Sequence, residues 1–464
     1  MANSRKKRSK PAVPSLVEQV SRVLKCVVRP GDRLLVGLSG GVDSIVLLDV
    51  LARLGARLKF RLRAVHVNHQ LSPNAAAWAR FCRAACRERG VPCRVAKVHI
   101  VRANSIERAA REARYAEFAK EDAEHILLAH NADDQAETLL LQLFRGAGVK
   151  GLAAMPLQRR RVITGARGCA REVSVVRPLL DVPRAHIERY ATRRKLRWIE
   201  DESNLDTAYL RNWVRHDVVP VIAQRVPAYR TTFSRASRNL GEAAQLLDDL
   251  ARLDAGDAVA GTGLAVDDLR NVGPARAKNA LRYVIGLRGW PMPEADRLEE
   301  ALRQVLTARR DAKLAVDLGG YALMRHRGIV HLVPRADLRG GVNVVTWHGE
   351  HEVELPQMGG VLKLTRTRGA GLSAAQLESK IVTIRARNGG ERLQTDARRP
   401  RRTVKNLLQE ARVPPWQRDR LPFIYCGETL VCVPGVGVDA RFQAQPGEAS
   451  VVASWSALHT NFAL

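Results

Sequence analysis

Hydrophobic positions in the first 150 residues alternate between two spacings. Four short continuous apolar runs are typical of buried strands: 34–38, 62–67, 95–100 and 125–129. In the segments between and after them, apolar residues recur every three or four positions, which predicts helices: 44–54, 75–89, 104–123 and 133–145. Such alternation predicts an α/β fold, a doubly wound parallel sheet with helices on both faces. Ligands in such folds bind at the carboxyl ends of the strands.

The pattern changes after residue 150. Residues 156–175 contain many Arg and Gly and predict a mobile loop, and later segments predict amphipathic helices followed, from about residue 320, by short strands. We therefore expect a helical domain and a small basic α+β C-terminal domain after the first domain. We predict a basic flexible tail over 1–25 and a nucleotide-binding domain over 26–220. The helical domain is predicted over 221–335 and the C-terminal domain over 336–464.

Charge and cysteine content narrow the functional classes. The 464 residues contain 76 Lys and Arg against 47 Asp and Glu, a formal net charge of +29, which favours a polyanionic partner. The seven cysteines show no disulfide spacing and no C-x-x-C pair, which fits a reducing, cytoplasmic setting. No apolar run has the length of a membrane span, and the basic N-terminus lacks the apolar region of a secretory signal. We expect no membrane partner.

The hexapeptide Ser-Gly-Gly-Val-Asp-Ser at 39–44 lies between the first predicted strand and the first predicted helix. Gly40 and Gly41 let the backbone approach a ligand, and two serine hydroxyls and the amides of a helix N-terminus can bind phosphate. Asp43 would repel phosphate unless a cation lies between them, and Mg²⁺ is the natural candidate. The alternative is a structural turn that happens to be rich in Gly and Ser.

A second cluster of polar residues begins the helix after the fourth strand. Asp133, Asp134 and Glu137 follow His130 and share one side of that helix. Carboxylates at a helix start can simply complement the helix dipole. That explanation does not account for His130, or for a further acidic residue, Asp43, at a neighbouring strand end. The cluster could hold Mg²⁺ or bind the amino groups of a cationic substrate.

Two arginines on the helix before the fourth strand are further candidates. Arg111 and Arg114 lie on one side of it and could neutralise phosphates or contact an RNA backbone. The alternative is a solvated helix face on which Arg111 pairs with Glu107.

The order of these motifs resembles that of the bacterial tRNA(Ile)-lysidine synthetase family of PP-loop ATP-pyrophosphatases. Motifs of that family occur in sequence order: 39–44, 65–69, 110–115, 130–138, 145–148, 177–180, 200–204 and 211–212. The match is specific over about 30–215 and looser to the C-terminus, where 381–420 carries 11 basic and 4 acidic residues. Asn131 departs from the pattern, since a second His is frequent there.

The resemblance implies a reaction. ATP would adenylate the carbon-2 carbonyl oxygen of the wobble cytidine of isoleucine tRNA with a CAU anticodon. Free L-lysine would then displace AMP and form lysidine, which switches codon reading from AUG to AUA. The cofactors implied are ATP and Mg²⁺, with Asp43 as the metal ligand.

The resemblance also assigns roles to residues of this chain. Catalytic roles fall on five positions: Asp43, Asp133, Asp134, Glu137 and Arg111. ATP binding falls on nine: Ser39, Gly40, Gly41, Val42, Asp43, Ser44, His66, His69 and His130. Lysine binding falls on Asp133, Asp134 and Glu137. Contacts with tRNA fall on five basic residues: Arg114, Arg211, Arg387, Arg392 and Lys405.

Three other functions stay open at this point. An RNA thiolase of the same ATPase class would normally use C-x-x-C pairs, which this sequence lacks. A glutamine-dependent synthetase would need an amidotransferase half, for which no nucleophile motif is present. A non-catalytic tRNA-binding protein on a decayed ATPase scaffold would not need its acidic residues intact. The oligomeric state is also open, a homodimer included.

Overall fold

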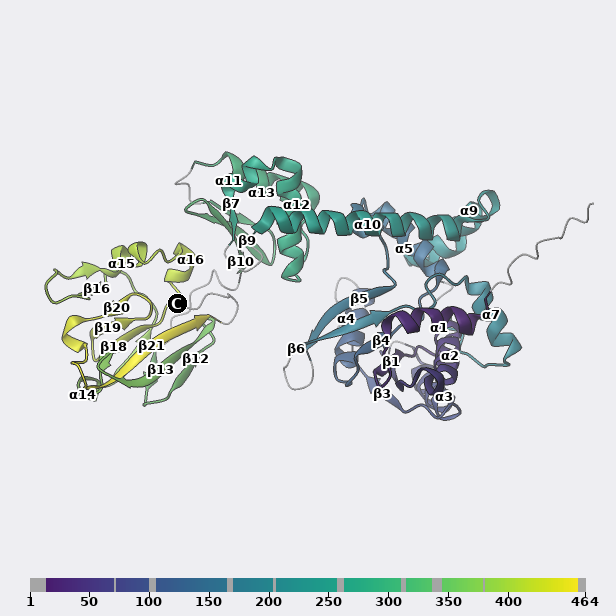
Figure 1. Cartoon of the computed structure of the whole chain (residues 1–464), viewed down its shortest axis with the longest axis horizontal. Coiled ribbons are helices and arrows are strands. Elements are labelled where there is room, and N and C mark those ends of the chain that lie inside the picture. Colours follow the sequence, from purple (N-terminus) through teal and green to yellow (C-terminus); the bar gives the residue numbers. More distant parts are fainter. Residues whose placement is uncertain are drawn as a thin grey trace, which may run out of the picture. The chain divides into compact units, whose positions relative to one another are not determined.

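The computed structural model divides the chain into two compact units, residues 1–245 and 246–464 (Figure 1). It describes nine stretches of the chain: 14–70, 72–99, 106–164, 170–202, 206–256, 263–309, 314–335, 344–378 and 380–457. The predicted domain boundaries at 220 and 335 stay predictions. Among the described residues, no helix has the length and apolarity needed to cross a membrane.

The first unit is built on a six-stranded sheet in the order β3-β2-β1-β4-β6-β5. The bounds of its strands are β1 Arg33–Gly37, β2 Arg61–Asn68, β3 Cys93–Lys97, β4 His125–Leu127, β5 Gln158–Thr164 and β6 Ala170–Val176. All neighbours pair in parallel except β5, which pairs antiparallel with β6 at the edge. The strand order reverses beside β1, between β2 and β4. A ligand crevice is expected at such a reversal.

Helices cover both faces of this sheet, which confirms the predicted doubly wound fold. Their bounds are α1 Leu16–Val27, α2 Val42–Leu58, α3 Ala75–Arg87, α4 Ile106–Ala119, α5 Ala132–Phe144, α6 Val149–Leu152 and α7 Arg184–Arg193. Leu34 and Val36 of β1 pack in one core with α1, α2, α3 and α7, whereas Leu35 packs in a second core with α4. This follows because successive side chains of a strand point to opposite faces.

The remaining helices of the first unit follow α7. They are α8 Leu210–Trp213, the π-helix η2 Val214–Val218, α9 Val219–Arg225 and α10 Tyr229–Ala255. Both α8 and η2 pack against α5. The last helix, α10, runs past the division between the two units.

Two local predictions were wrong. The mobile loop expected over 156–175 contains the strands β5 and β6, because Val173 and Val175 are buried against the sheet while intervening polar residues face outward. The flexible tail expected over 1–25 is helical from Leu16, since α1 has a capping box at Ser15 and buries Val20 in the core. Residues 1–13 lie outside the described part.

The second unit combines helices with antiparallel sheets. Its first part has α11 Val266–Asn271, α12 Pro274–Leu287 and α13 Ala295–Thr307 with a four-stranded sheet of β7 Leu264–Ala265, β10 Ile329–Pro334, β9 Tyr321–His326 and β8 Leu314–Asp317. The helices share an apolar core with this sheet.

The C-terminal part of the second unit contains two larger antiparallel sheets over one core. One sheet has β11 Val345–Trp347, β15 Val382–Arg385, β18 Phe423–Cys426, β19 Thr429–Val433 and β20 Gly437–Val438, and the other has β12 Glu352–Leu355, β13 Gly360–Arg368, β21 Ala449–Ala457 and β14 Leu372–Ser373. A two-stranded sheet, β16 Arg392–Leu393 and β17 Arg402–Thr403, and the helices α14 Ala374–Leu377, α15 Val404–Glu410 and α16 Pro415–Arg418 complete it. The predicted α+β character is confirmed.

Candidate active site

The loop at 39–44, called here the phosphate loop, joins β1 to α2. Its hydroxyls hydrogen-bond inside the loop: Gly40 N donates to Ser44 Oγ at 3.1 Å, and Ser44 Oγ donates to Gly41 O at 2.9 Å. Gly40 has a φ of +96°, and a Cβ there would lie 2.6 Å from Ile199 Cδ1. The positive φ favours glycine at this position, and a side chain there would also displace the Ile199 methyl group. The loop is held in one shape before any ligand binds.

Asn131 links the phosphate loop to the helix α5. As the N-cap of α5 it accepts hydrogen bonds at Oδ1 from Asp133 N (2.9 Å) and Asp134 N (3.1 Å). Its Nδ2 donates to Asp43 Oδ1 at 3.0 Å, and Asp134 Oδ2 accepts from Asn131 N at 3.0 Å. The carboxyl ends of β1 and β4 are thus connected through a single buried amide side chain. Sequence reasoning noted Asn131 only as a departure from the family pattern.

Asp43 lies in a low-dielectric, mixed-charge environment. Burial is the largest cause that raises the pKa of its carboxyl, to about 6; Arg184 opposes this shift and Asp134 adds to it. Arg184 Nη1 is 3.9 Å from Asp43 Oδ2. A cation beside Asp43 would stabilise its charged form.

The donors around Asp43 fit Mg²⁺ shared with a nucleotide. Mg²⁺ is usually bound by one or two carboxylates together with substrate phosphates, rather than by an all-protein cage. Asp43 supplies the carboxylate, and the phosphate loop adjoins it. In the stretches that the structure describes, no group of three or more His, Cys, Asp or Glu side chains is arranged to bind a metal by itself.

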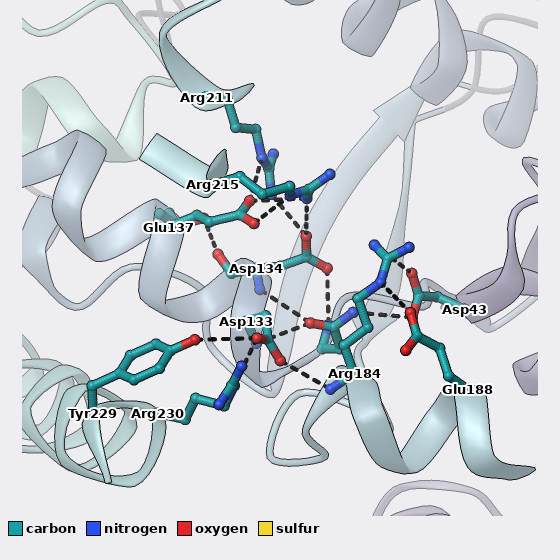
Figure 2. A network of polar contacts seen from close by, with 12 residues as sticks. Asp43, Asp133, Asp134, Glu137, Arg184, Glu188, Arg211, Arg215, Tyr229 and Arg230 are labelled. Atoms are coloured by element: carbon teal, nitrogen blue, oxygen red, sulfur yellow. Dashed lines mark hydrogen bonds and ion pairs between the residues drawn. The ribbon is translucent and has the colours of Figure 1, made fainter. Parts of the chain in front are cut away.

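Asp134 and Glu137 of α5 pair with two arginines from a distant segment (Figure 2). Arg211 Nε is 3.0 Å from Glu137 Oε2 and its Nη2 is 3.1 Å from Asp134 Oδ1. Arg215 Nε is 2.6 Å from Glu137 Oε1, and its Nη2 is 3.4 Å from Asp134 Oδ1. Glu137 has only 3% of its surface exposed, and these two guanidinium groups are its ion-pair partners.

Asp133 points to other partners (Figure 2). Its Oδ1 accepts hydrogen bonds from Arg230 Nε at 2.6 Å and from the Tyr229 hydroxyl at 3.3 Å, and its Oδ2 accepts one from Arg184 N at 2.9 Å. We call the three carboxylates of α5, Asp133, Asp134 and Glu137, the acidic cluster. Three arginine side chains pair with this cluster, and a fourth, Arg184, lies near Asp43.

The three predicted histidines differ in their surroundings. His66 Nδ1 is 2.9 Å from Leu38 O, so it fixes the end of β1 next to the phosphate loop. Both ring nitrogens of His69 and the Nδ1 of His130 are buried without a protein partner. Burial, followed by Arg114, lowers the pKa of His69 to about 4, and burial, followed by Arg177, lowers that of His130 to about 3. Both rings are neutral near pH 7 and could bind a ligand.

Arg111 and Arg114 lie exposed on α4, on the second face of the sheet. Arg111 Cζ is 5.5 Å from the Tyr115 ring centroid, and Arg161 Cζ approaches the same ring to 3.9 Å. Both arginines contribute to lowering the pKa of His130, and their predicted catalytic and tRNA-binding roles stay predictions.

The predicted tRNA contacts fall in different environments. Arg211 pairs with Asp134 and Glu137 of the acidic cluster. In the second unit, Arg387 is 3.5 Å from Asp419 and 3.9 Å from Glu391, Arg392 donates to Arg401 O at 2.9 Å, and Lys405 is exposed on α15. Ion pairs thus neutralise part of the net positive charge of residues 381–420. Residues 203 and 204 of the 200–204 motif lie outside the described part.

Sequence reasoning missed several residues of this site. Arg184, Tyr229 and Arg230 were not considered, and Arg215 was noted without a role. A weak signal existed, because Arg211 and Arg215 are four residues apart and therefore share one helix side. Nothing in the sequence indicated that this side would face α5.

The fold and the phosphate loop show the class of protein to which the first unit belongs. A doubly wound sheet with a phosphate-binding loop after its first strand is the architecture of a PP-loop domain, and the family model described as "PP-loop domain" matches residues 14–222. Two further family models match the second unit: "TilS substrate binding domain" at 264–331 and "TilS substrate C-terminal domain" at 382–455.

Relatives that match most of the chain identify the family. The tRNA(Ile)-lysidine synthase of Nitrosomonas europaea is 43% identical over 434 residues, covering 93% of each chain. That of Chromobacterium violaceum is 42% identical over 89% of this chain and 93% of its own, and that of Coxiella burnetii is 36% identical over 89% and 91%. The chain belongs to the tRNA(Ile)-lysidine synthase family. The PP-loop fold, expected from the sequence, is confirmed.

Proposed function

We propose that this enzyme ligates free L-lysine to carbon 2 of the wobble cytidine of isoleucine tRNA with a CAU anticodon. ATP is split into AMP and pyrophosphate, and lysidine is the product. The observation that carries this proposal is the bridge formed by Asn131, which places Asp43 of the phosphate loop beside the acidic cluster. One site can then hold a nucleotide and a cationic amino acid next to each other.

In the first step, the carbon-2 carbonyl oxygen of cytidine attacks the α-phosphorus of ATP and pyrophosphate leaves. The amides and hydroxyls of residues 39–44 bind phosphate oxygens, and Arg184 lies close enough to Asp43 to compensate negative charge there. A bound Mg²⁺ would neutralise charge that develops on the leaving pyrophosphate. His69 follows β2 and His130 follows β4, on either side of β1, and these neutral, partly buried rings would contact the nucleotide.

In the second step, an amine of lysine attacks carbon 2, loses a proton, and AMP leaves. Lysine carries an ammonium group that needs a carboxylate partner in a buried site. Glu137, Asp134 and Asp133 supply such partners, and their arginines now occupy those positions. Lysine binding therefore requires that at least one of these ion pairs rearranges.

The decisive experiment combines purified protein, ATP, Mg²⁺, labelled lysine and tRNA transcripts with a CAU anticodon. We expect AMP release and lysine incorporation with the isoleucine tRNA and not with methionine tRNA. AMP release without incorporation would keep the ATPase class but reject lysine as the nucleophile, in favour of a thiolase or another synthetase. An absence of turnover with every substrate would instead favour the tRNA-binding protein.

The basic C-terminal residues should act mainly on tRNA affinity. Replacing the exposed Lys405 by Ala should weaken tRNA binding a few-fold and reduce the slope of log affinity against log salt by about 1. The KM for ATP should not change. An unaltered salt slope would argue against a phosphate contact at this residue. Point variants are preferable to a cut at 380, which would remove β21 from its partner β13.

The oligomeric state, a homodimer included, stays open, and a cytoplasmic location completes the proposal. Sedimentation at two protein concentrations tests the first, and cell fractionation tests the second.

A further inference from the structure

An exposed apolar face lies next to the acidic cluster and has no role in the chemistry described so far. It is formed by the end of α5 and the start of α8, which pack against each other. Its members are large apolar side chains with exposed fractions of 39–57%: Leu143, Phe144, Tyr209, Leu210 and Trp213. Single exposed apolar residues are ordinary on protein surfaces, but a group of this size, three of them aromatic, indicates an interaction site.

Two of the three aromatic rings are in contact. The ring centroids of Phe144 and Trp213 are 6.0 Å apart with an interplanar angle of 45°. Trp213 N donates to Tyr209 O at 3.0 Å, which sets the two side chains one helical turn apart on the same side of α8. We call Phe144, Tyr209 and Trp213 the aromatic face.

Basic side chains flank the aromatic face. Arg145 and Lys150 are exposed beside it, whereas Arg211 and Arg215 are paired with Asp134 and Glu137. Arg145 is exposed directly after Phe144. Aromatic rings interleaved with basic side chains are the combination by which proteins bind unpaired nucleotides, because every base has a stacking face and every linkage has a phosphate.

The aromatic face is also continuous with the site. Arg211 comes from the same turn of α8 as Trp213, and its guanidinium contacts Asp134 and Glu137 (Figure 2). In η2, the adjoining π-helix, Arg215 makes the same connection. A nucleotide on the aromatic face would therefore lie beside the place where the modified base must enter.

We propose that the aromatic face is a stacking platform for the unpaired bases that flank the modified cytidine. The inference rests on the proposed function, since it assumes an RNA substrate whose target base is drawn out of its stack. Stacking of the flanking bases would hold the loop open and offset the cost of unstacking the target.

The test uses the full-length protein and an anticodon stem-loop RNA with a CAU anticodon. Titration of the stem-loop should quench the fluorescence of Trp213, so the Trp213→Phe variant should lose that part of the signal while it keeps its affinity. The Trp347→Phe variant, in the C-terminal sheet, should retain the wild-type quenching. A blunt duplex with the same stem and no loop should give no quenching that depends on Trp213.

Affinity gives the second readout. Trp213→Ala and Tyr209→Ala should each weaken stem-loop binding about tenfold, the range of one lost base–aromatic stack. The KM values for ATP and lysine should stay unchanged. Leu253→Ala, at an apolar position of α10 that is more exposed than either aromatic residue, is the control and should bind like the wild type. Tyr209 is more exposed than Trp213, so its variant keeps the test valid if Trp213→Ala does not fold.

Two results would overturn the inference. Unchanged stem-loop affinity in both alanine variants would exclude stacking. A concentration-dependent dimer that both variants abolish would assign the aromatic face to a second copy of the chain. Neither result touches the proposed function, which instead fails if the wild-type enzyme incorporates no lysine into any tRNA.

Discussion

The phosphate loop and the acidic cluster are two halves of one site that are stabilised in opposite ways. The polar groups of the phosphate loop hydrogen-bond to other hydroxyl, amide and carbonyl groups of residues 39–44. The carboxylates of the acidic cluster bind arginines that are 74 to 97 positions away in the chain, together with the backbone of Arg184. Local hydrogen bonds fix the first half, and tertiary ion pairs fix the second.

The difference implies different steps for ligand binding. A phosphate must replace hydrogen bonds that the phosphate loop makes within itself, so its binding requires changes only inside residues 39–44. A cationic ligand must compete with guanidinium groups for carboxylates of low exposure, and breaking such a pair without replacement is costly. We therefore expect nucleotide binding to tolerate changes in the distant segments, and lysine binding to depend on them.

The largest expected effect is at Asp43, where the two halves meet. Replacing Asp43 by Asn should reduce AMP formation about 1,000-fold or more, because the carboxylate that would hold Mg²⁺ is lost. Binding of tRNA, measured by filter retention, should remain within about twofold. Equal loss of both activities would show that Asp43 supports the fold and not the phosphate chemistry.

The same residue gives a pH-dependent effect on stability. Burial raises the pKa of folded Asp43 to about 6, from 3.8 as the ordinary value. Between these values the folded state keeps a proton that the unfolded state has released, so stability falls as pH rises through this window. The resulting loss in the free energy of unfolding is at most about 3 kcal/mol and is complete above pH 6.

Removing the ionisable group should therefore stabilise the protein at neutral pH. The free energy of unfolding of Asp43→Asn should exceed that of the wild type at pH 7.5, and the difference should vanish near pH 3.5. Urea titrations of the first unit's transition at both pH values measure this. A difference that grows on acidification would contradict the assigned direction.

The next effect concerns the acidic cluster. Glu137→Gln should raise the KM for lysine about 30-fold or more, since one partner of a buried charge pair is removed. The KM for ATP should change little. Glu172→Gln, which removes an exposed partner of Arg160 at the sheet edge, is the matched control and should leave both constants unchanged. Equal increases in the KM values for lysine and ATP would show that the acidic cluster and the phosphate loop do not bind different ligands.

The smallest effect of the series is expected for the phosphate loop backbone. Gly40→Ala introduces a Cβ against Ile199 at positive φ and should raise the KM for ATP about tenfold, with the KM for lysine nearly constant. Gly55→Ala, inside α2 where the added methyl meets only ordinary contacts, should preserve activity and slightly increase stability. Similar behaviour of the two variants would mean that the loop is not preformed.

Much of the first domain could be predicted from local patterns. The alternation of apolar runs and helical periodicity indicated the parallel sheet, and the strand ends indicated where ligands bind. The β5–β6 hairpin was missed because its Arg-rich edge strand buries few side chains and resembles a loop in composition. The start of α1 was missed because basic residues precede it and hide its amphipathic pattern.

The sequence by itself determined the parts of this protein that depend on neighbours in the chain. The phosphate loop needs only a strand, two glycines and a helix start, and the capping of α5 by Asn131 needs only the next three residues. Which cations compensate the acidic cluster was decided by the tertiary structure, since Arg211, Arg215 and Arg230 reach it from the distant elements α8, η2 and α10, while the Arg184 guanidinium of α7 reaches Asp43. Coulomb interactions depend on distance in space and on burial, and neither quantity is written in the spacing of residues along the chain.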